Sequence, residues 1–118
     1  MLPIHIAIAT TDGKFVNEHF GRARCFYIVA LDKEGHRLVE RRAVPPVCDG
    51  GMHEDNALDA AAALLGDCRA VLVSRIGPPA KRRLEKSGIS VFEIGLPIED
   101  ALARLRDYYD REVRETRV

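Results

Sequence analysis

The fold of this 118-residue chain is predicted from the stretch Ile4-His5-Ile6-Ala7-Ile8-Ala9-Thr10. After Thr11 it continues as Asp12-Gly13-Lys14-Phe15-Val16-Asn17-Glu18-His19-Phe20-Gly21. Its first half is a continuous run of β-branched and small residues, which is typical of a central strand buried on both faces. Asp12-Gly13 then signals a turn. His19 follows between a carboxylate and an aromatic ring, in a loop where an imidazole nitrogen is available to a ligand. A single loop histidine is more often a hydrogen-bonded structural residue than a ligand, so this stretch alone does not define a site.

Two further strands are predicted before the first helix. Residues 25–31 form the second strand, and residues 36–44, after a turn at residues 32–35, form the third. The short links predict that strands one to three make an antiparallel meander. In the third strand we expect Leu38 and Val44 to point inward and the charged run Glu40-Arg41-Arg42 to be largely solvated.

The remainder of the chain alternates between helices and strands. Pro45-Pro46 ends the third strand. The predicted elements after it are a helix over residues 54–65, a short buried strand over 70–73, a helix over 80–87, a strand over 89–94 and a last helix from Ile98 to Tyr109. This order, βββαβαβα, predicts a single α/β domain with a mixed five-stranded sheet and three helices, in which strands four and five run parallel to strand one. We expect the domain to occupy residues 1–110 and the charged residues 111–118 to fray as a C-terminal tail.

This topology brings several chemically useful side chains to one edge of the sheet. His19 leaves the end of strand one, Cys48 and His53 follow strand three, and Arg75 follows strand four. The carboxyl ends of parallel strands are where open α/β sheets bind ligands. We therefore expect these four residues to lie along one edge, where a thiolate and imidazoles suit soft or borderline metal centres. The alternative is that these are ordinary solvated loops.

Short motifs spread along the chain resemble the family of dinitrogenase iron–molybdenum cofactor carrier and biosynthesis proteins. The motifs are Asp12-Gly13, Asn17-Glu18-His19-Phe20-Gly21, Ser74-Arg75-Ile76-Gly77 and Leu84-x-x-x-Gly88-Ile89. The resemblance covers residues 4–108. It implies a sheet of ribonuclease-H-like topology and a protein that transiently holds an iron–sulfur precursor of the nitrogenase iron–molybdenum cofactor, or the cofactor itself. It also implies nitrogenase cofactor-assembly proteins as partners.

The resemblance selects one candidate ligand, His19, and the shared edge supplies the other candidates. His19 matches the family's histidine and is the first candidate to coordinate a cluster, with Cys48 as the second candidate metal ligand. Cys48 and His53 share a glycine-containing loop, and their spacing permits joint ligation. Arg75 is expected to face an anionic cluster, and Asn17, from the same motif as His19, completes the expected cofactor-binding set.

The helix predicted to begin near Pro79 is expected to support an anion at this edge. Its first turn would add unpaired amides and the positive end of the helix dipole, and Lys81 and Arg82 would add charge. Arg83 is more typical of a solvated helix face.

Composition and cysteine spacing exclude several other classes. Charged residues make up 31% of the chain, and the 18 Lys and Arg balance the 18 Asp and Glu, so no global basic field favours nucleic acid. No apolar run is long enough to span a membrane and the start lacks the basic segment of a signal peptide, so we expect a cytoplasmic protein. Cys25, Cys48 and Cys68 form no CxxC motif, which disfavours a disulfide framework or a self-sufficient iron–sulfur site.

Enzymatic activity is not expected. The first strand carries no carboxylate to hold magnesium for ribonuclease H chemistry, and no P-loop or Gly-x-Gly-x-x-Gly motif occurs. The prediction is a binding module, present as a monomer or weak homo-oligomer. Two alternatives stay open. One is a regulatory or sensing domain of the same fold that binds another metal cluster or a small anion without a link to nitrogenase; the other is a hydrolase that uses Asp12 and His19.

Overall fold

The computed structural model describes residues 2–44 and 54–115 of the chain. Within these ranges the strands and α-helices follow the predicted order βββαβαβα, with one short 3-10 turn added after the first strand. The elements are β1 (Ile4–Ala9), η1 (Phe20–Arg22), β2 (Cys25–Asp32), β3 (Gly35–Ala43), α1 (Glu54–Leu64), β4 (Cys68–Val73), α2 (Pro78–Lys86), β5 (Ser90–Glu93) and α3 (Ile98–Glu115).

The strands form one mixed sheet in the order β3-β2-β1-β4-β5. The central strand β1 pairs antiparallel with β2 and parallel with β4, so that Ala7 lies between Ile28 on one side and Val71 on the other. β3 extends the antiparallel half and β5 extends the parallel half. The predicted central position of the first strand, the antiparallel meander and the ribonuclease-H-like plan are therefore confirmed.

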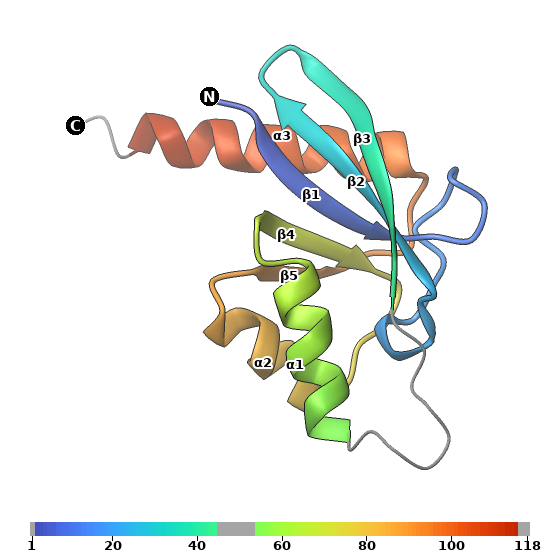
Figure 1. The fold of residues 1–118 in the computed structure, drawn as a ribbon. Coiled ribbons are helices and arrows are strands. Elements are labelled where there is room, and N and C mark those ends of the chain that lie inside the picture. Colours follow the sequence, from blue (N-terminus) through green and yellow to red (C-terminus); the bar gives the residue numbers. More distant parts are fainter. Residues whose placement is uncertain (1, 45–53, 116–118) are drawn as a thin grey trace.

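Side chains of β1 alternate between two cores. Ala7 and Ala9 belong to the core that α1 and α2 cover, whereas Ile6 and Ile8 belong to the core under α3 (Figure 1). All four are fully buried. The alanines leave room for α1, whose Ala62 packs in the same cluster. Burial of each isoleucine stabilises the fold by about 1.5–3 kcal/mol relative to exposure.

The edge strand β3 is much less buried than predicted. Leu38 is 51% exposed, so the expectation that it points into the core is wrong. Alternation along a strand predicts which side chains share a face, but it does not reveal whether a helix covers that face. Val44, just after the strand, does pack against the core under α1 and α2, as expected.

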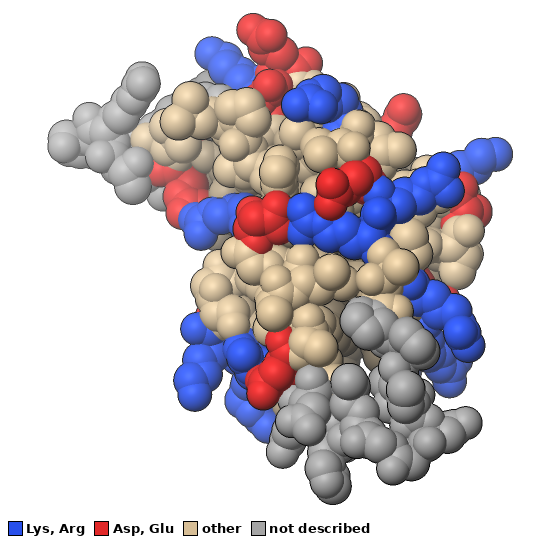
Figure 2. Space-filling view, viewed as in Figure 1, with Lys and Arg blue, Asp and Glu red and all other residues tan. Residues whose placement is uncertain are grey.

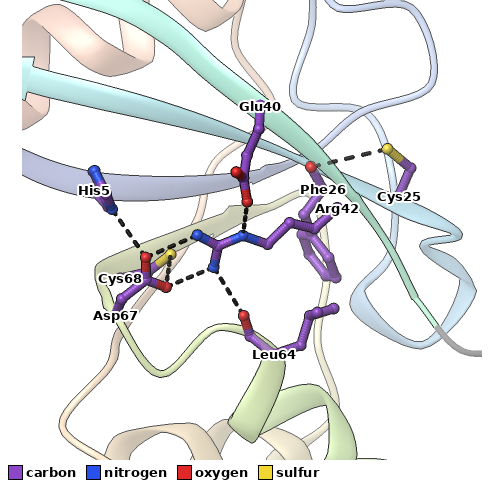
Figure 3. Close-up of polar contacts among 8 residues, drawn as sticks. All are labelled: His5, Cys25, Phe26, Glu40, Arg42, Leu64, Asp67 and Cys68. Atoms are coloured by element: carbon purple, nitrogen blue, oxygen red, sulfur yellow. Dashed lines mark hydrogen bonds and ion pairs between the residues drawn. The ribbon is translucent and has the colours of Figure 1, made fainter.

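One arginine of the charged run in β3 is held in an ion-pair cluster rather than solvated (Figure 3). The guanidinium of Arg42 donates to both carboxylate oxygens of Asp67, at 2.5 and 2.8 Å, and to the backbone oxygen of Leu64 at 2.9 Å. It also pairs with Glu40, and the Nδ1 atom of His5 lies 3.0 Å from Asp67. This cluster ties β3 to the turn between α1 and β4.

The last helix is longer than the apolar pattern predicted. The chain was expected to fray from Arg111, yet α3 continues to Glu115. An ion pair between Arg69 of β4 and Glu112, with a distance of 3.2 Å, holds the helix against the sheet beyond the predicted end. The division into a domain ending at residue 110 and a tail stays a prediction.

Candidate functional site at the carboxyl edge of the sheet

The loop that leaves β1 is shaped by its own polar side chains. The buried hydroxyl of Thr10 accepts the Gly13 N–H at 3.0 Å, and the Asp12 carboxylate accepts the N–H groups of Lys14 and Phe15 at 2.9 and 3.0 Å. These donors hold the pKa of Asp12 below its usual value, because they stabilise the charged form. Asp12 therefore builds the turn, and its carboxylate is poorly suited to act as the base of a hydrolase.

A glycine is required at the tip of this turn. Gly13 has a φ of +73°, which favours glycine. A Cβ atom there would lie 3.0 Å from the Tyr27 ring, a tight contact that would require the ring to shift by a few tenths of an ångström. The turn signal in the sequence thus marks a left-handed position that leaves little room for a side chain.

Asn17, one of the predicted cofactor-binding residues, has a structural role in this loop. Its side-chain oxygen accepts the Thr11 N–H at 2.9 Å, and its amide group donates to the Thr11 hydroxyl, also at 2.9 Å. Both ends of the amide are engaged within the loop, which closes the segment between Thr11 and Asn17. A direct contact from Asn17 to a cofactor stays a prediction.

Backbone hydrogen bonds fasten the loop across the carboxyl ends of all three parallel strands. The bonds run from Glu18 N to Ala9 O (3.3 Å), from Ser74 N to Glu18 O (3.0 Å), from Phe20 N to Arg75 O (2.9 Å), from Val16 N to Leu96 O (3.0 Å) and from Ile98 N to Lys14 O (2.8 Å). The first reaches β1, the next two reach the exit of β4, the fourth reaches the segment between β5 and α3, and the last reaches the first residue of α3. Anchored in this way, the loop is preorganised, which reduces the ordering cost of binding a ligand.

His19 and Arg75 lie side by side at this edge. The two residues form an isolated parallel β-bridge, so both lie at the edge to which the topology assigned them. The His19 N–H donates to the side chain of Glu18 at 3.1 Å, but its half-buried imidazole has no hydrogen-bond partner among the described residues. The exposed guanidinium of Arg75 likewise has no ion-pair partner within residues 2–44 and 54–115. Both side chains are therefore available, while their role in binding stays a prediction.

The remaining predicted ligands are Cys48 and His53, and the chain has two further cysteines. Cys48 and His53 lie outside the described residues, so their place at this edge stays a prediction. Of the two remaining cysteines, Cys25 is half-buried and Cys68 is buried, and both are free thiols. Burial raises the pKa of the Cys68 thiol to about 12, so this group stays protonated and is a poor metal ligand.

Two arginines near His19 were missed by the sequence reasoning. Arg22 closes η1, where its N–H donates to the His19 oxygen at 3.1 Å, and Arg24 follows two residues later. Both are exposed, and Figure 2 shows Lys and Arg side chains gathered over this segment. The Gly21-Arg22-Ala23-Arg24 sequence directly after the histidine motif was the available signal. Arg22 and Arg24 are thus two exposed cations on the segment that directly follows His19, whereas Glu18 places a carboxylate just before it.

The start of α2 supports an anion less well than expected. The helix begins with Pro78 and Pro79, which have no N–H, and the Lys81 N–H is already bonded to the Gly77 oxygen at 3.0 Å. Of these first four helical residues only Ala80 has an N–H left for a ligand. Arg83, expected to be solvated, pairs instead with Asp59 of α1 at 2.7 Å and donates to Ser87. Lys81 is half-buried and Arg82 is exposed, so both keep the predicted possibility of facing an anion.

The described residues offer few side chains that are arranged to bind a metal ion. No group of three or more His, Cys, Asp or Glu side chains in that part of the chain is arranged to hold a metal ion. No helix there is long and apolar enough to cross a membrane. Within that part of the chain, the edge offers the His19 imidazole without a hydrogen-bond partner, beside Arg75 and next to the Glu18 carboxylate.

Comparisons with known proteins point to one protein family. The family model described as dinitrogenase iron-molybdenum cofactor matches residues 3–108. FeMo cofactor biosynthesis protein NifB of Herbaspirillum seropedicae is 40% identical over 88 residues, which make up 75% of this chain and 17% of that protein. Protein NifY of Klebsiella pneumoniae is 36% identical over 78 residues, or 66% of this chain and 32% of that protein. The chain therefore spans less than a third of either relative.

Among solved structures, the crystal structure of PH0822 superposes with a TM-score of 0.67 and 26% sequence identity. The match covers 88% of this chain and 91% of that one.

Proposed function

The chain belongs to the dinitrogenase iron-molybdenum cofactor family, and we propose that it is a binding module that transiently holds an iron–sulfur precursor of the nitrogenase cofactor, or the cofactor itself, and hands it on. The names of the relatives NifB and NifY support a place in cofactor biosynthesis. Partners under this proposal are other cofactor-assembly proteins. Its setting is the cytoplasm, where free thiols such as Cys25 and Cys68 stay reduced.

The observation that carries this proposal is the His19 side chain. Its imidazole is half-buried on a loop that is hydrogen-bonded to the ends of β1 and β4 and to the segment after β5. No described group forms a hydrogen bond with its ring nitrogens. A neutral imidazole is a suitable donor to iron. Arg75 and Arg22 would offset the negative charge of a sulfide cluster and its organic acid.

The small donor set also favours a carrier over a resident cofactor site. A structural cluster is usually held by several thiolates, whereas a cargo that must be released benefits from few protein ligands and an open position. Catalysis is not part of the proposal, because the Asp12 carboxylate is engaged by backbone donors of its own turn.

The proposal is tested by anaerobic titration with isolated cofactor precursor. Iron content after gel filtration gives the stoichiometry, and circular dichroism confirms folding. We expect His19→Ala to stay folded and to lose most of the bound iron, because a loop residue contributes little core burial. His5→Ala is the matched control and is expected to bind as the parent does.

One outcome would refute the proposed site, and another would assign the ligand to a different loop. If folded His19→Ala keeps the stoichiometry and affinity of the parent, the histidine is structural and the proposed site is wrong. If Cys48→Ser alone abolishes binding, the ligand lies in the loop that contains Cys48 and His53.

A further inference from the structure

The two edge strands of the sheet differ in how well they are protected from pairing with another strand. β3 contains a bulge in its pairing with β2, and five of its nine residues are His, Arg or Glu. Bulges and charged side chains are the usual protection of an edge. β5 is short, but it pairs with β4 without a register shift, and Glu93 is its one charged residue. The outer edge of β5 is therefore the less protected of the two.

The backbone of β5 presents hydrogen-bonding groups to this outer edge. The Ile94 N–H donates to the Val73 oxygen at 2.8 Å, and successive residues of a strand turn their N–H and C=O groups to opposite sides. Val91 and Glu93 therefore turn theirs away from β4. Within residues 2–44 and 54–115, no strand other than β4 pairs with β5, which lies at the margin of the sheet (Figure 1).

Apolar side chains beside this edge are incompletely covered on both faces of the sheet. Val91 packs against the core under α1 and α2, and Phe92 packs against the core under α3, yet both are only half-buried. Their partners on β4, Val71 and Leu72, are fully buried. The Tyr108 ring meets Phe92 edge-on with centroids 5.8 Å apart, and Tyr108 is 47% exposed. A strand added beside β5 would bury more of this apolar surface.

The flank of α2 nearest this edge carries charges of both signs. Leu84 of α2 is buried in the core, and Arg83 pairs with Asp59 of α1. With 3.6 residues per turn, the flank opposite Arg83 carries Lys81 and Glu85, one turn apart, and it faces away from α1. Neither Lys81 nor Glu85 has an ion-pair partner within the described ranges.

We propose that two copies of the chain pair antiparallel through the outer edges of β5, which joins their five-stranded sheets into one. With the two-fold axis at Phe92, Val91 lies opposite Glu93 of the partner subunit, and each such pair exchanges both of its N–H···O bonds. Phe92 then lies opposite its own copy. The same axis sets the two α2 helices antiparallel, which brings Lys81 toward Glu85 of the partner subunit. The contact does not involve His19, so it is independent of cluster binding.

A second copy fits this edge better than a strand of unrelated sequence. The edge is complementary to itself, because one two-fold operation pairs the outward backbone groups and also brings opposite charges of α2 together. An unrelated strand would satisfy the backbone of β5 but would leave Lys81 and Glu85 without partners. Because β5 has only four residues, we expect a dimer that dissociates on dilution.

The test measures the molecular mass of the full chain in solution. Sedimentation equilibrium over a range of protein concentrations gives the dissociation constant of the dimer. We expect the mean mass of the parent to rise from that of one chain toward twice that value as the concentration increases. Glu93→Pro is expected to stay at the mass of one chain, because proline removes an outward donor and leaves the bonds to β4 intact. Circular dichroism confirms that the variant is folded.

Charge exchange on α2 tests the symmetric arrangement without a change in the strand. Lys81→Glu is expected to raise the dissociation constant about tenfold at low salt, because a carboxylate would then face Glu85 of the partner subunit at both symmetric positions. Adding Glu85→Lys reverses both signs, so the double variant should return to within about threefold of the parent. Arg82→Glu, at an exposed residue on the side of α2 that points away from the sheet, is the matched control and should dimerise as the parent does.

Three results would overturn the proposal. The first is a parent that keeps the mass of one chain at every concentration, which would leave this edge to a strand of another protein. The second is a dimer that persists unchanged in folded Glu93→Pro, which would place the contact elsewhere on the surface. The third is a double variant that dimerises no better than Lys81→Glu, which would show that the two charges do not meet across the axis.

Discussion

Two histidines, His5 at the start of β1 and His19 in the loop after it, differ in what surrounds their side chains. His5, near the start of the strand, lies 3.0 Å from Asp67 in a cluster where that carboxylate is also held by both Nη atoms of Arg42. His19, after the end of the strand, has no ring partner among the described residues and stands beside Arg75, whose charge is also unpaired there. The two residue types are the same, and the difference lies in what surrounds them.

This difference separates charges that hold the fold from charges that are available to a ligand. In the Arg42–Asp67 cluster the guanidinium holds the pKa of Asp67 well below its usual range, and the carboxylate raises that of Arg42. Figure 3 shows these side chains pointing toward one another from β3 and from the turn before β4. At the carboxyl edge, backbone hydrogen bonds and local side chains such as Asp12 and Asn17 hold the loop, while the His19 imidazole and the Arg75 guanidinium have no polar partner among the described residues. We therefore expect changes in the first cluster to affect stability, and changes at the edge to affect binding.

The largest effect on stability is expected from Arg42→Leu. This change removes the bonds from the guanidinium to Asp67 and to the Leu64 oxygen, and it leaves Asp67 with only its weaker contacts to His5 and Cys68. We expect a loss of about 2 kcal/mol in the free energy of unfolding, with cluster binding unchanged. Urea denaturation and iron stoichiometry measure the two quantities. Loss of cluster binding without loss of stability would contradict the assignment of the Arg42–Asp67 cluster to the fold and of the carboxyl edge to binding.

Gly13→Ala is expected to affect both properties. The new methyl group would meet the Tyr27 ring in a backbone conformation that disfavours alanine, at a cost of about 1–2 kcal/mol. Because the same turn leads into His19, iron binding should weaken as well. Gly88→Ala is the control, since Gly88 also has a positive φ (+83°) but faces open space far along the chain. Its cost should be smaller, and its iron binding should equal that of the parent.

The Asp67 cluster predicts a pH dependence of stability. The folded-state pKa of Asp67 is depressed, so its contribution is present above the ordinary aspartate pKa near 3.9 and is lost as pH falls below that value. Because the Asp67 side chain is 47% exposed, we expect about 1 kcal/mol at most. Unfolding measured between pH 7 and pH 3 should show a shallower decline for Asp67→Asn than for the parent. Parallel curves would mean that Asp67 contributes through shape alone.

The smallest effect is expected from Arg75→Ala at high salt. Arg75 is exposed, so its attraction to an anionic cargo is screened by ions. The variant should retain the cluster less well than the parent at low ionic strength and nearly as well at high ionic strength. An equal deficit at every salt concentration would assign Arg75 a packing role. Stability should not change, in contrast to Arg42→Leu.

Much of the fold was predictable because it depends on short-range patterns. The apolar run from Ile4 to Thr10 indicated a doubly buried strand, and the alternation of helices and strands after Pro46 dictated parallel pairing. The exposure of Leu38 was not predictable, since it depends on how far α3 extends over the sheet. The pairing of Arg42 with Asp67 was missed as well, because it joins residues 25 positions apart, one on β3 and the other after α1.

The candidate site was predictable in part for a similar reason. Strand direction alone brought His19 and Arg75 to one edge. The engagement of Asn17 with Thr11 could not be inferred, because an asparagine in a loop can face either a ligand or its own backbone. Arg22 and Arg24 were visible as residues, but their position beside His19 depends on the short turn η1, which has no strong sequence signal.

The most direct test of the central claim is to detect the imidazole of His19 on the cargo. The protein is produced with 15N-histidine, loaded anaerobically with cofactor precursor in a paramagnetic state, and studied by electron spin echo envelope modulation. The account predicts a nitrogen coupling that changes with the label in the parent and in His5→Ala, and that is missing from His19→Ala at the same iron loading. A coupling that ignores the label, or that persists in His19→Ala, would contradict it.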